Sequence, residues 1–257
     1  MRDWLETAPG AYALNWMQGQ ADAAVADVFG YHAMQIGLPA LQGLRSNRMP
    51  AQWLAALSAG ELRAATGVGR PPALLCDSTA LPVEAASIDL LVLPLTLDLS
   101  LDPHQTLREV ERVLVPEGKV LILGLNPASL WGLRQQRAHL YRRMGIGQLF
   151  LPAEGDFIAY WRLRDWLRLL GFEVESSAFG CYRPALRTAH WLQRYAWLDK
   201  LGARSWPIFG AAYAVMAVKR VRGMQLLGPV WKKKRALGKK GVPAVNRAHS
   251  EVQGKGH

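Results

Sequence analysis

Four side chains in this sequence are suited by type and position to chemistry on a bound ligand. Asp77 and Ser78 come directly after the apolar run 73–76, and Asp98 follows the next long apolar run. Ligands of open α/β sheets bind at the carboxyl ends of strands, where a carboxylate accepts hydrogen bonds from ligand amino or hydroxyl groups. Asp98 and His104 are the candidates for a general base or a substrate anchor.

Each of these residues also has a structural interpretation. Asp77 is suited to forming the turn that begins residues 77–82. Asp98 also suits a solvated loop, and His104 suits the exposed first turn of a helix. We favour a functional role for Asp77 and leave both interpretations open for Asp98 and His104.

Cysteine usage excludes two other kinds of site. Cys76 and Cys181 are too few for a disulfide framework and lack the spacing of metal ligands. We expect buried thiols and no metal.

No targeting or spanning segment is evident. The first ten residues are charged and lack the apolar stretch of a secretory signal. The apolar run 206–218 is shorter than the roughly 20 residues a spanning helix needs, and it contains Pro207 and Gly210. We expect a cytoplasmic protein without a transmembrane segment.

The elements that would position the candidates are strands and a capped helix. Apolar runs at 73–76, 88–95 and 119–125 are typical of strands covered on both faces. Between the last two, Asp102 is placed to cap a helix that begins at Pro103 and ends near Pro116. Strand, helix and strand in that order predict a right-handed crossover and a parallel pair.

The faces of this helix are predicted from residue spacing. One face is apolar, and the charged residues are expected to face solvent. The apolar face consists of Leu107, Val110, Val113 and Leu114, and the charged face of Arg108, Glu109, Glu111 and Arg112.

Three runs carry a family resemblance: D-S-T-A-L-P at 77–82, S-I-D-L-L-V at 87–92 and D-P-H-Q-T-L-R-E-V-E-R-V-L-V-P-E-G-K-V-L-I at 102–122. They resemble the class I S-adenosylmethionine-dependent methyltransferases, specifically the type-11 group that includes the quinone C-methyltransferases. One departure is Glu117, where the family usually has glycine. The resemblance implies an α/β fold with a seven-stranded Rossmann-like sheet, mostly parallel with the last strand antiparallel, and helices on both faces.

The resemblance also implies a cofactor, S-adenosylmethionine, and residues to bind it. Asp77 would accept from the adenine amino group, the Ser78 amide would donate to a ring nitrogen, and Leu95 would provide an apolar contact. Gly37 is what remains of the family's glycine-rich loop, because it is followed by Leu-Pro-Ala-Leu. The cofactor is therefore either held differently or not held. Glu61 is a candidate for the ribose-binding acid, with a solvated surface carboxylate as the alternative.

The remaining segments are assigned by pattern. Residues 1–220 are expected to form the methyltransferase-like domain, with an N-terminal helix in 1–29 and an insertion near the pocket at 128–155. Helical spacing in the first segment places Tyr12 and Trp16 either in a lid over the cofactor or in the core. The apolar run 206–218 is expected to supply the seventh strand.

Charge is concentrated at one end of the sequence. The net charge is +11, and residues 219–257 hold eleven Lys and Arg against one acid, so they carry +10 and residues 1–218 carry +1. Residues 221–257 are predicted to be a disordered basic tail. The segment 231–241 would contact nucleic acid or an anionic membrane, or the tail would be solubilising with no fixed partner.

The resulting functional hypothesis is methyl transfer from S-adenosylmethionine to an unidentified acceptor. Displacement at an activated sulfonium methyl needs mainly positioning of the acceptor, which is why no catalytic constellation is required. The alternative is a degenerate member of the fold that acts as a binding or scaffold module. It rests on the reduced glycine loop and the uncertain ribose acid.

Overall fold

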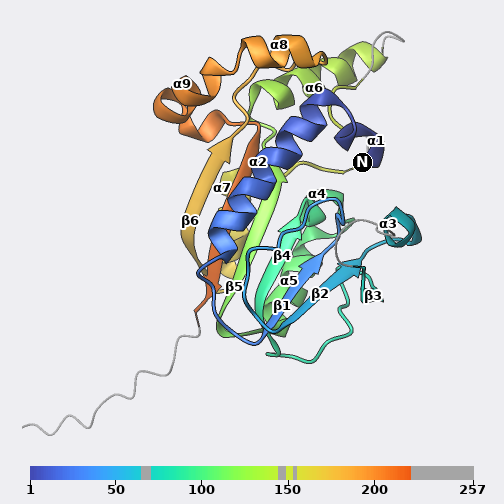
Figure 1. Cartoon of the computed structure of the whole chain (residues 1–257), viewed down its shortest axis with the longest axis vertical. Coiled ribbons are helices and arrows are strands. Elements are labelled where there is room, and N and C mark those ends of the chain that lie inside the picture. The colour runs from blue at the N-terminus through green and yellow to red at the C-terminus, as the bar shows by residue number, and fades with distance from the viewer. Residues whose placement is uncertain (65–70, 144–148, 153–154, 221–257) are drawn as a thin grey trace, which may run out of the picture. The chain divides into compact units, whose positions relative to one another are not determined.

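The computed structural model describes residues 1–64, 71–143, 149–152 and 155–220 (Figure 1). The described residues form a seven-stranded sheet in the order β3-β2-β1-β4-β5-β7-β6. All neighbouring strands are parallel except β7, which is antiparallel to both β5 and β6. The predicted fold class is confirmed. The predicted tail at 221–257, including 231–241, lies outside the described residues.

The strands and helices have the following bounds. The strands are β1 (His32–Ile36), β2 (Ala51–Ala56), β3 (Leu74–Leu75), β4 (Ile88–Pro94), β5 (Leu114–Leu125), β6 (Phe172–Gly180) and β7 (Ala212–Lys219). The helices are α1 (Arg2–Leu5), α2 (Ala8–Val25), α3 (Ala59–Ala64), α4 (Thr96–Leu99), α5 (Pro103–Val113), α6 (Leu130–Arg143), α7 (Tyr160–Leu169), α8 (Ala189–Arg194), α9 (Trp197–Ser205) and the 3-10 turn η1 (Pro207–Phe209).

Two apolar layers cover the sheet. Helix α2 packs on one face, where Met17 and Ala21 are buried beside β5 and β7. Helices α5 and α7 pack on the other face, where Leu107 and Leu163 are fully buried (Figure 1). The central strands β4 and β5 read as continuous apolar runs because both of their faces are covered.

Helix α5 begins as predicted but ends earlier. The Asp102 carboxylate accepts from the Gln105 amide at 3.0 Å, which caps the helix. The helix ends at Val113, and Leu114 already starts β5 and pairs with Ile88 of β4. The strand therefore begins two residues before Pro116.

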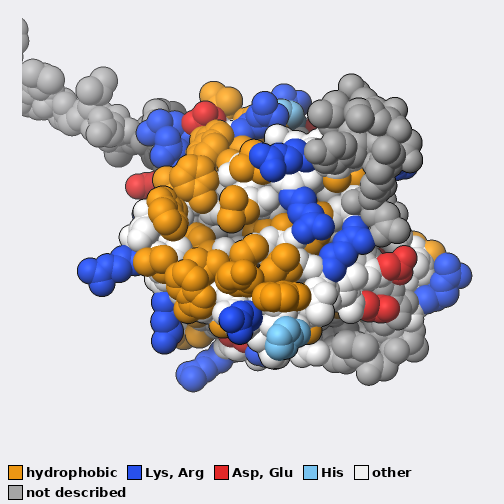
Figure 2. Space-filling model, turned by 90° about the horizontal axis from the view of Figure 1, so that it is seen from above, with side chains coloured by type: hydrophobic (Ala, Val, Ile, Leu, Met, Phe, Trp, Pro, Cys, Tyr) orange, Lys and Arg blue, Asp and Glu red, His pale blue; other side chains and the backbone are white. Residues whose placement is uncertain are grey.

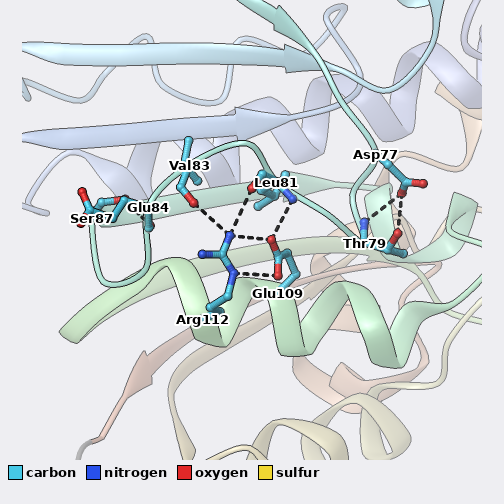
Figure 3. A network of polar contacts seen from close by, with 8 residues as sticks. All are labelled: Asp77, Thr79, Leu81, Val83, Glu84, Ser87, Glu109 and Arg112. Carbon is cyan, nitrogen blue, oxygen red and sulfur yellow. Dashed lines mark hydrogen bonds and ion pairs between the residues drawn. The ribbon is translucent and has the colours of Figure 1, made fainter.

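The prediction that Glu109 faces solvent is wrong. Glu109 is buried, and its carboxylate accepts from the Leu81 amide at 2.8 Å. The Arg112 guanidinium donates to both oxygens of the same carboxylate. It also donates to the carbonyls of Leu81 and Val83, at 3.1 and 2.9 Å (Figure 3). These two side chains fasten the irregular segment between β3 and β4 to helix α5. The hydrogen bond from Arg112 lowers the pKa of Glu109.

Glu117 occupies a backbone conformation that favours glycine. Its φ is 64°, in the left-handed region, and its carboxylate pairs with exposed Arg220. Replacing Glu117 with glycine is expected to raise the free energy of unfolding by about 1 kcal/mol, because left-handed backbone costs a residue with a Cβ about that much. The exposed ion pair offsets little of this gain.

Urea denaturation measures the effect of this substitution. Glu117→Gln is the control, because it removes the charge and keeps the strained backbone. Equal midpoints for the two variants would assign the effect to charge instead of conformation.

The predicted seventh strand begins later than expected. Strand β7 starts at Ala212, and the preceding residues Trp206, Ile208 and Phe209 are exposed around η1. The apolar run was thus two elements, a strand buried between β5 and β6 and an exposed apolar turn. At the opposite edge of the sheet, the Asp89 carboxylate accepts from the amides of Tyr31 and His32, each at 2.9 Å.

Candidate functional site at the carboxyl edge of the sheet

Backbone strain gathers at one edge of the sheet. Five non-glycine residues of the described chain have left-handed φ, and three of them lie within two residues of the end of a strand: Leu38 after β1, Leu95 after β4 and Cys181 after β6. Strand β6 runs in the same direction as β1 and β4, so all three lie at the carboxyl edge. Such residues cluster at ligand sites, and this is the edge where open α/β sheets bind ligands.

The segment after β1 turns without a glycine-rich loop. Gly37 and Leu38 are both left-handed, with φ of 77° and 46°. The buried Gln35 amide donates to the carbonyls of Gly37, Leu38 and Leu41 and accepts from the Gly43 amide. One side chain thus supplies the hydrogen bonds that keep this turn compact. A helix does not form between β1 and β2, where residues 37–50 are turns and irregular backbone.

Glu61 reaches the ends of the first two strands from α3. Its carboxylate accepts from the Leu57 amide at 2.8 Å, just beyond β2, and from the Leu38 amide at 3.4 Å, just beyond β1. A carboxylate has about four acceptor positions, so two backbone amides leave room for ligand hydroxyl groups. Glu61 is therefore a part-buried carboxylate bonded to backbone and not the fully solvated surface group of the alternative. Its role as the ribose-binding acid stays a prediction.

Asp77 and Ser78 lie at the end of β3. Asp77 is exposed, and its Oδ1 accepts from the amide and hydroxyl of Thr79 at 2.9 and 2.8 Å (Figure 3). The amide of Thr79, followed by its hydroxyl, lowers the pKa of Asp77. The turn-forming role is therefore present. Within the described residues, neither Asp77 Oδ2 nor the Ser78 amide has a hydrogen-bond partner, so an acceptor and a donor remain side by side for a ligand.

The predicted residues after β4 are packed inside the protein. Leu95 is fully buried, and the hydroxyl of Thr96 donates to the Ile36 carbonyl at 2.6 Å, which joins the ends of β4 and β1. A Cβ at Gly37 would lie 3.0 Å from Leu57 and 3.6 Å from the Thr96 hydroxyl. Leu95 and Gly37 therefore lie beneath the candidate site at the carboxyl edge of the sheet.

Asp98 and His104 are not brought together. Asp98 is 1% exposed, and its two oxygens accept from the amides of Leu125 and Ile158 at 3.0 and 3.3 Å. Burial raises the pKa of Asp98 to about 7, against the opposing effect of those amides. His104 is exposed and contacts the Trp166 ring at 3.9 Å between centroids. The alternative of a solvated loop carboxylate is therefore wrong for Asp98, and its role as a general base or substrate anchor stays a prediction.

An apolar cavity of about 420 Å³ lies over the ends of β5, β6 and β7. Ala128 follows β5, Cys181 follows β6 and Ala211 precedes β7, so the cavity opens at the same edge as the residues above. Most of its lining is aliphatic or aromatic, as in pockets for small organic molecules. The rest of the lining comes from α6, α9 and the residues around η1: Leu130, Trp131, Leu133, Leu198, Gly202, Trp206 and Phe209, with Tyr182 and Arg183.

A polar cluster adjoins this cavity. The Tyr12 hydroxyl donates to Asp199, which also accepts from Arg183 Nε at 2.8 Å, and the guanidinium lies 4.2 Å from the Tyr12 ring centre. Burial raises the pKa of the Tyr12 phenol and of the Cys181 thiol well above their usual ranges. Both groups therefore stay protonated at neutral pH.

Sequence reasoning missed most of this cluster. Asp199 is the lone acid among residues 181–210, and that isolation was the available signal. The two expectations for the N-terminal helix separate here, because Trp16 packs against Gly180 in the core whereas Tyr12 reaches the cavity cluster.

A second cavity, of about 340 Å³, lies beside the sheet face instead of its carboxyl edge. Its lining comes from β1, β2 and the segment between them, including Gln35, Leu44 and Leu54. It occupies the region under the segment where a helix is missing. No group of three or more His, Cys, Asp or Glu suited to a metal occurs in the part of the chain that the structure describes.

Part of the chain matches a known family of domains. Residues 54–122, from β2 to β5, match a family model described as a methyltransferase domain (Methyltransf_11). This part of the chain is similar to a methyltransferase domain. The match begins after the turn that follows β1, so the remodelled loop lies outside it.

One curated relative matches less than half of the chain. The Escherichia coli (strain K12) uncharacterized protein YafS is 37% identical over 106 residues. This match spans 41% of the present chain and 41% of that protein, so less than half of the relative's length is covered.

Solved structures show that the similarity in fold extends beyond this domain match. A SAM-dependent methyltransferase from Thermotoga maritima is similar at TM-score 0.58 and 15% identity, over 85% of this chain and 94% of that one. Another, from Archaeoglobus fulgidus, has TM-score 0.56 and 14% identity, over 80% and 94%. A [4+2]-cyclase has TM-score 0.55 and 17% identity, over 80% of both chains. Because these identities are low, they show the fold alone.

Proposed function

We propose that this protein transfers a methyl group from S-adenosylmethionine to an apolar acceptor held in the 420 Å³ cavity. The observation that carries the proposal is the open donor and acceptor pair at the end of β3. Asp77 Oδ2 and the Ser78 amide have no partner among the described residues. This pair is complementary to the amino group and ring nitrogen of adenine.

Other residues at the edge fit the remaining parts of the cofactor. Glu61 would accept from the ribose hydroxyls, Leu95 would form apolar floor, and the turn at Gly37 would bring backbone close to the methionine end. When bound, S-adenosylmethionine supplies an activated methyl group. The cofactor would bind at the carboxyl ends of strands β1 to β4. The cavity for the acceptor adjoins β5, the neighbour of β4 in the sheet.

The protein's own part in the reaction is to position the acceptor and exclude water. Apolar walls around Trp131 and Phe209 favour an acceptor with an apolar body. The cluster of Tyr12, Arg183 and Asp199 offers a polar end for orienting it. Alignment of this kind can supply most of the catalysis for displacement at an activated carbon.

Titration calorimetry of the full chain with S-adenosylmethionine and S-adenosylhomocysteine tests this assignment. Asp77→Asn keeps the oxygen that forms the turn but removes the second acceptor, so we expect affinity to fall about ten-fold, or 1.4 kcal/mol. Thr79→Val is the matched control, because it removes the hydroxyl bond to the turn and keeps the carboxylate. It should retain the affinity of the unmodified protein.

The opposite outcomes identify the alternative role. Loss of affinity in Thr79→Val with none in Asp77→Asn would make Asp77 a turn former only. No binding to the folded full chain would favour a binding or scaffold module that keeps the fold without the cofactor. Contact of residues 231–241 with nucleic acid or membrane stays a separate prediction, measured by deleting that segment.

A further inference from the structure

Exposed apolar side chains gather on one end of the molecule. We define the cap as residues 130–143 and 181–210, which contain α6, α8, α9 and η1. Eight of the fifteen large hydrophobic side chains that are exposed in the described chain belong to it. They are Leu130, Leu133, Trp191, Trp197, Leu201, Trp206, Ile208 and Phe209.

The cap is also strongly basic. It holds nine Lys and Arg and one acid, Asp199, for a net charge of +8. The remainder of residues 1–218 holds eleven basic and eighteen acidic residues, for −7. The near-neutral total of the folded part therefore conceals a charge separation. Asp199 is paired with Arg183, whereas Arg194, Lys200 and Arg204 are exposed without a partner among the described residues.

The two properties coincide on one face. Figure 2 looks onto the end of the molecule that carries α6, α8 and α9, and shows hydrophobic side chains spread over it with Lys and Arg between and around them. Acidic side chains lie toward its margin. The apolar cavity opens here too, since its lining includes Leu130, Leu133, Trp206 and Phe209, which are all exposed cap residues.

We infer that the cap docks on an anionic lipid membrane surface. Tryptophan favours the boundary between water and acyl chains, and a basic face with aromatic side chains is attracted to anionic headgroups. A second copy of the chain is disfavoured as the occupant, because a symmetric contact would bring two faces of +8 together. No helix in the described ranges is long and apolar enough to span a bilayer.

Docking in this way turns the mouth of the cavity toward the bilayer. If the cavity binds the acceptor, as proposed above, the acceptor class is an apolar molecule that resides in the membrane. Membrane docking itself does not rest on methyl transfer, because it is measured without turnover. The two proposals can therefore fail independently.

Cosedimentation of the full chain with vesicles tests the inference. We compare phosphatidylcholine alone with phosphatidylcholine containing about one third phosphatidylglycerol. Trp197→Ala with Trp206→Ala is expected to lower partitioning into the anionic vesicles about ten-fold. Both side chains are more than half exposed, so their removal leaves no core cavity. Trp161→Ala, on exposed Trp161 of α7, is the matched control and should bind unchanged.

A second experiment reverses charges on the cap and measures binding to the same vesicles. Reversal of Arg194, Lys200 and Arg204 to glutamate should weaken binding to anionic vesicles about 100-fold, and the same change at Arg162, Arg164 and Arg168 of α7 should weaken it far less. The tail is identical in all variants, so differences report on the cap.

Three results would overturn the inference. The first is anionic binding that cap and control variants share equally, which would assign attachment to the tail. The second is equal binding to neutral vesicles. The third is a dimer in analytical ultracentrifugation that the double tryptophan variant converts to monomer, without vesicle binding by the unmodified chain.

Discussion

The folded protein is expected to lose stability as pH rises from about 4 to about 7, and Asp98→Asn is expected to remove that part of the pH dependence. Burial raises the pKa of Asp98 from 3.8 to about 7. In the unfolded chain the carboxyl ionises near the lower value. Between the two values the folded state therefore holds a proton that the unfolded state has released.

The direction and size of this effect follow from proton linkage. The stabilising contribution of Asp98 is fully present below the unfolded pKa and is lost as pH rises through the folded pKa. A shift of this size corresponds to at most about 4 kcal/mol. The Tyr213 hydroxyl is buried without a hydrogen-bond partner among the described residues, so it provides Asp98 no compensating bond.

Urea midpoints measured across this pH range for the unmodified chain and Asp98→Asn give the difference directly. Asp156→Asn serves as the control, since it removes an exposed carboxylate from the segment that also contributes the Ile158 amide. A pH profile that is the same in all three proteins would show that Asp98 ionises alike in the folded and unfolded states.

Arg112→Met is expected to lower the free energy of unfolding by about 2 kcal/mol. The substitution leaves the buried Glu109 carboxylate without its guanidinium and removes the donors to the Leu81 and Val83 carbonyls. The cost stays below that of a fully buried pair, because the Arg112 side chain is 38% exposed and water can replace part of its contacts.

Arg108→Met provides a matched control on the same helix. Arg108 is exposed and has no partner among the described residues, so its loss should change stability by less than about 0.5 kcal/mol. The double variant Glu109→Gln with Arg112→Met should recover part of the lost stability, because no charge remains to be buried. Equal effects of the two single arginine variants would show that the contacts of Arg112 with Glu109 and the segment before β4 do not stabilise the fold.

Apolar runs were sufficient to predict the central strands β4 and β5, whereas the number of strands and the antiparallel last strand were expected from the family resemblance. The run 88–95 is apolar apart from Asp89, because both faces of the strand are covered. This requirement is visible in the local sequence. The burial of Glu109 was not predictable in the same way. Helical spacing places it beside solvent-facing residues, and only the return of the segment carrying Leu81 gives its carboxylate an amide to accept.

The candidate site was predicted in part for a similar reason. Asp77, Ser78 and Leu95 lie within three residues of strand ends, so strand ends in the sequence locate them at the carboxyl edge. Tyr12 and Asp199 are 187 residues apart, and only tertiary packing brings them together. The left-handed backbone at Cys181 could not be predicted either, because cysteine has no preference for that conformation.

The position of β7 has a consequence for how the chain is made. This strand comes last among the seven, yet it lies between β5 and β6 rather than at an outer edge. Until residues 212–219 have been synthesised, both neighbours expose unpaired backbone groups on the sides that β7 later covers. Proteins are made from the N-terminus, and open strand edges favour aggregation. The sheet therefore becomes complete only when β7 inserts between β5 and β6. Until that insertion, the nascent chain is most dependent on protection against aggregation with other chains.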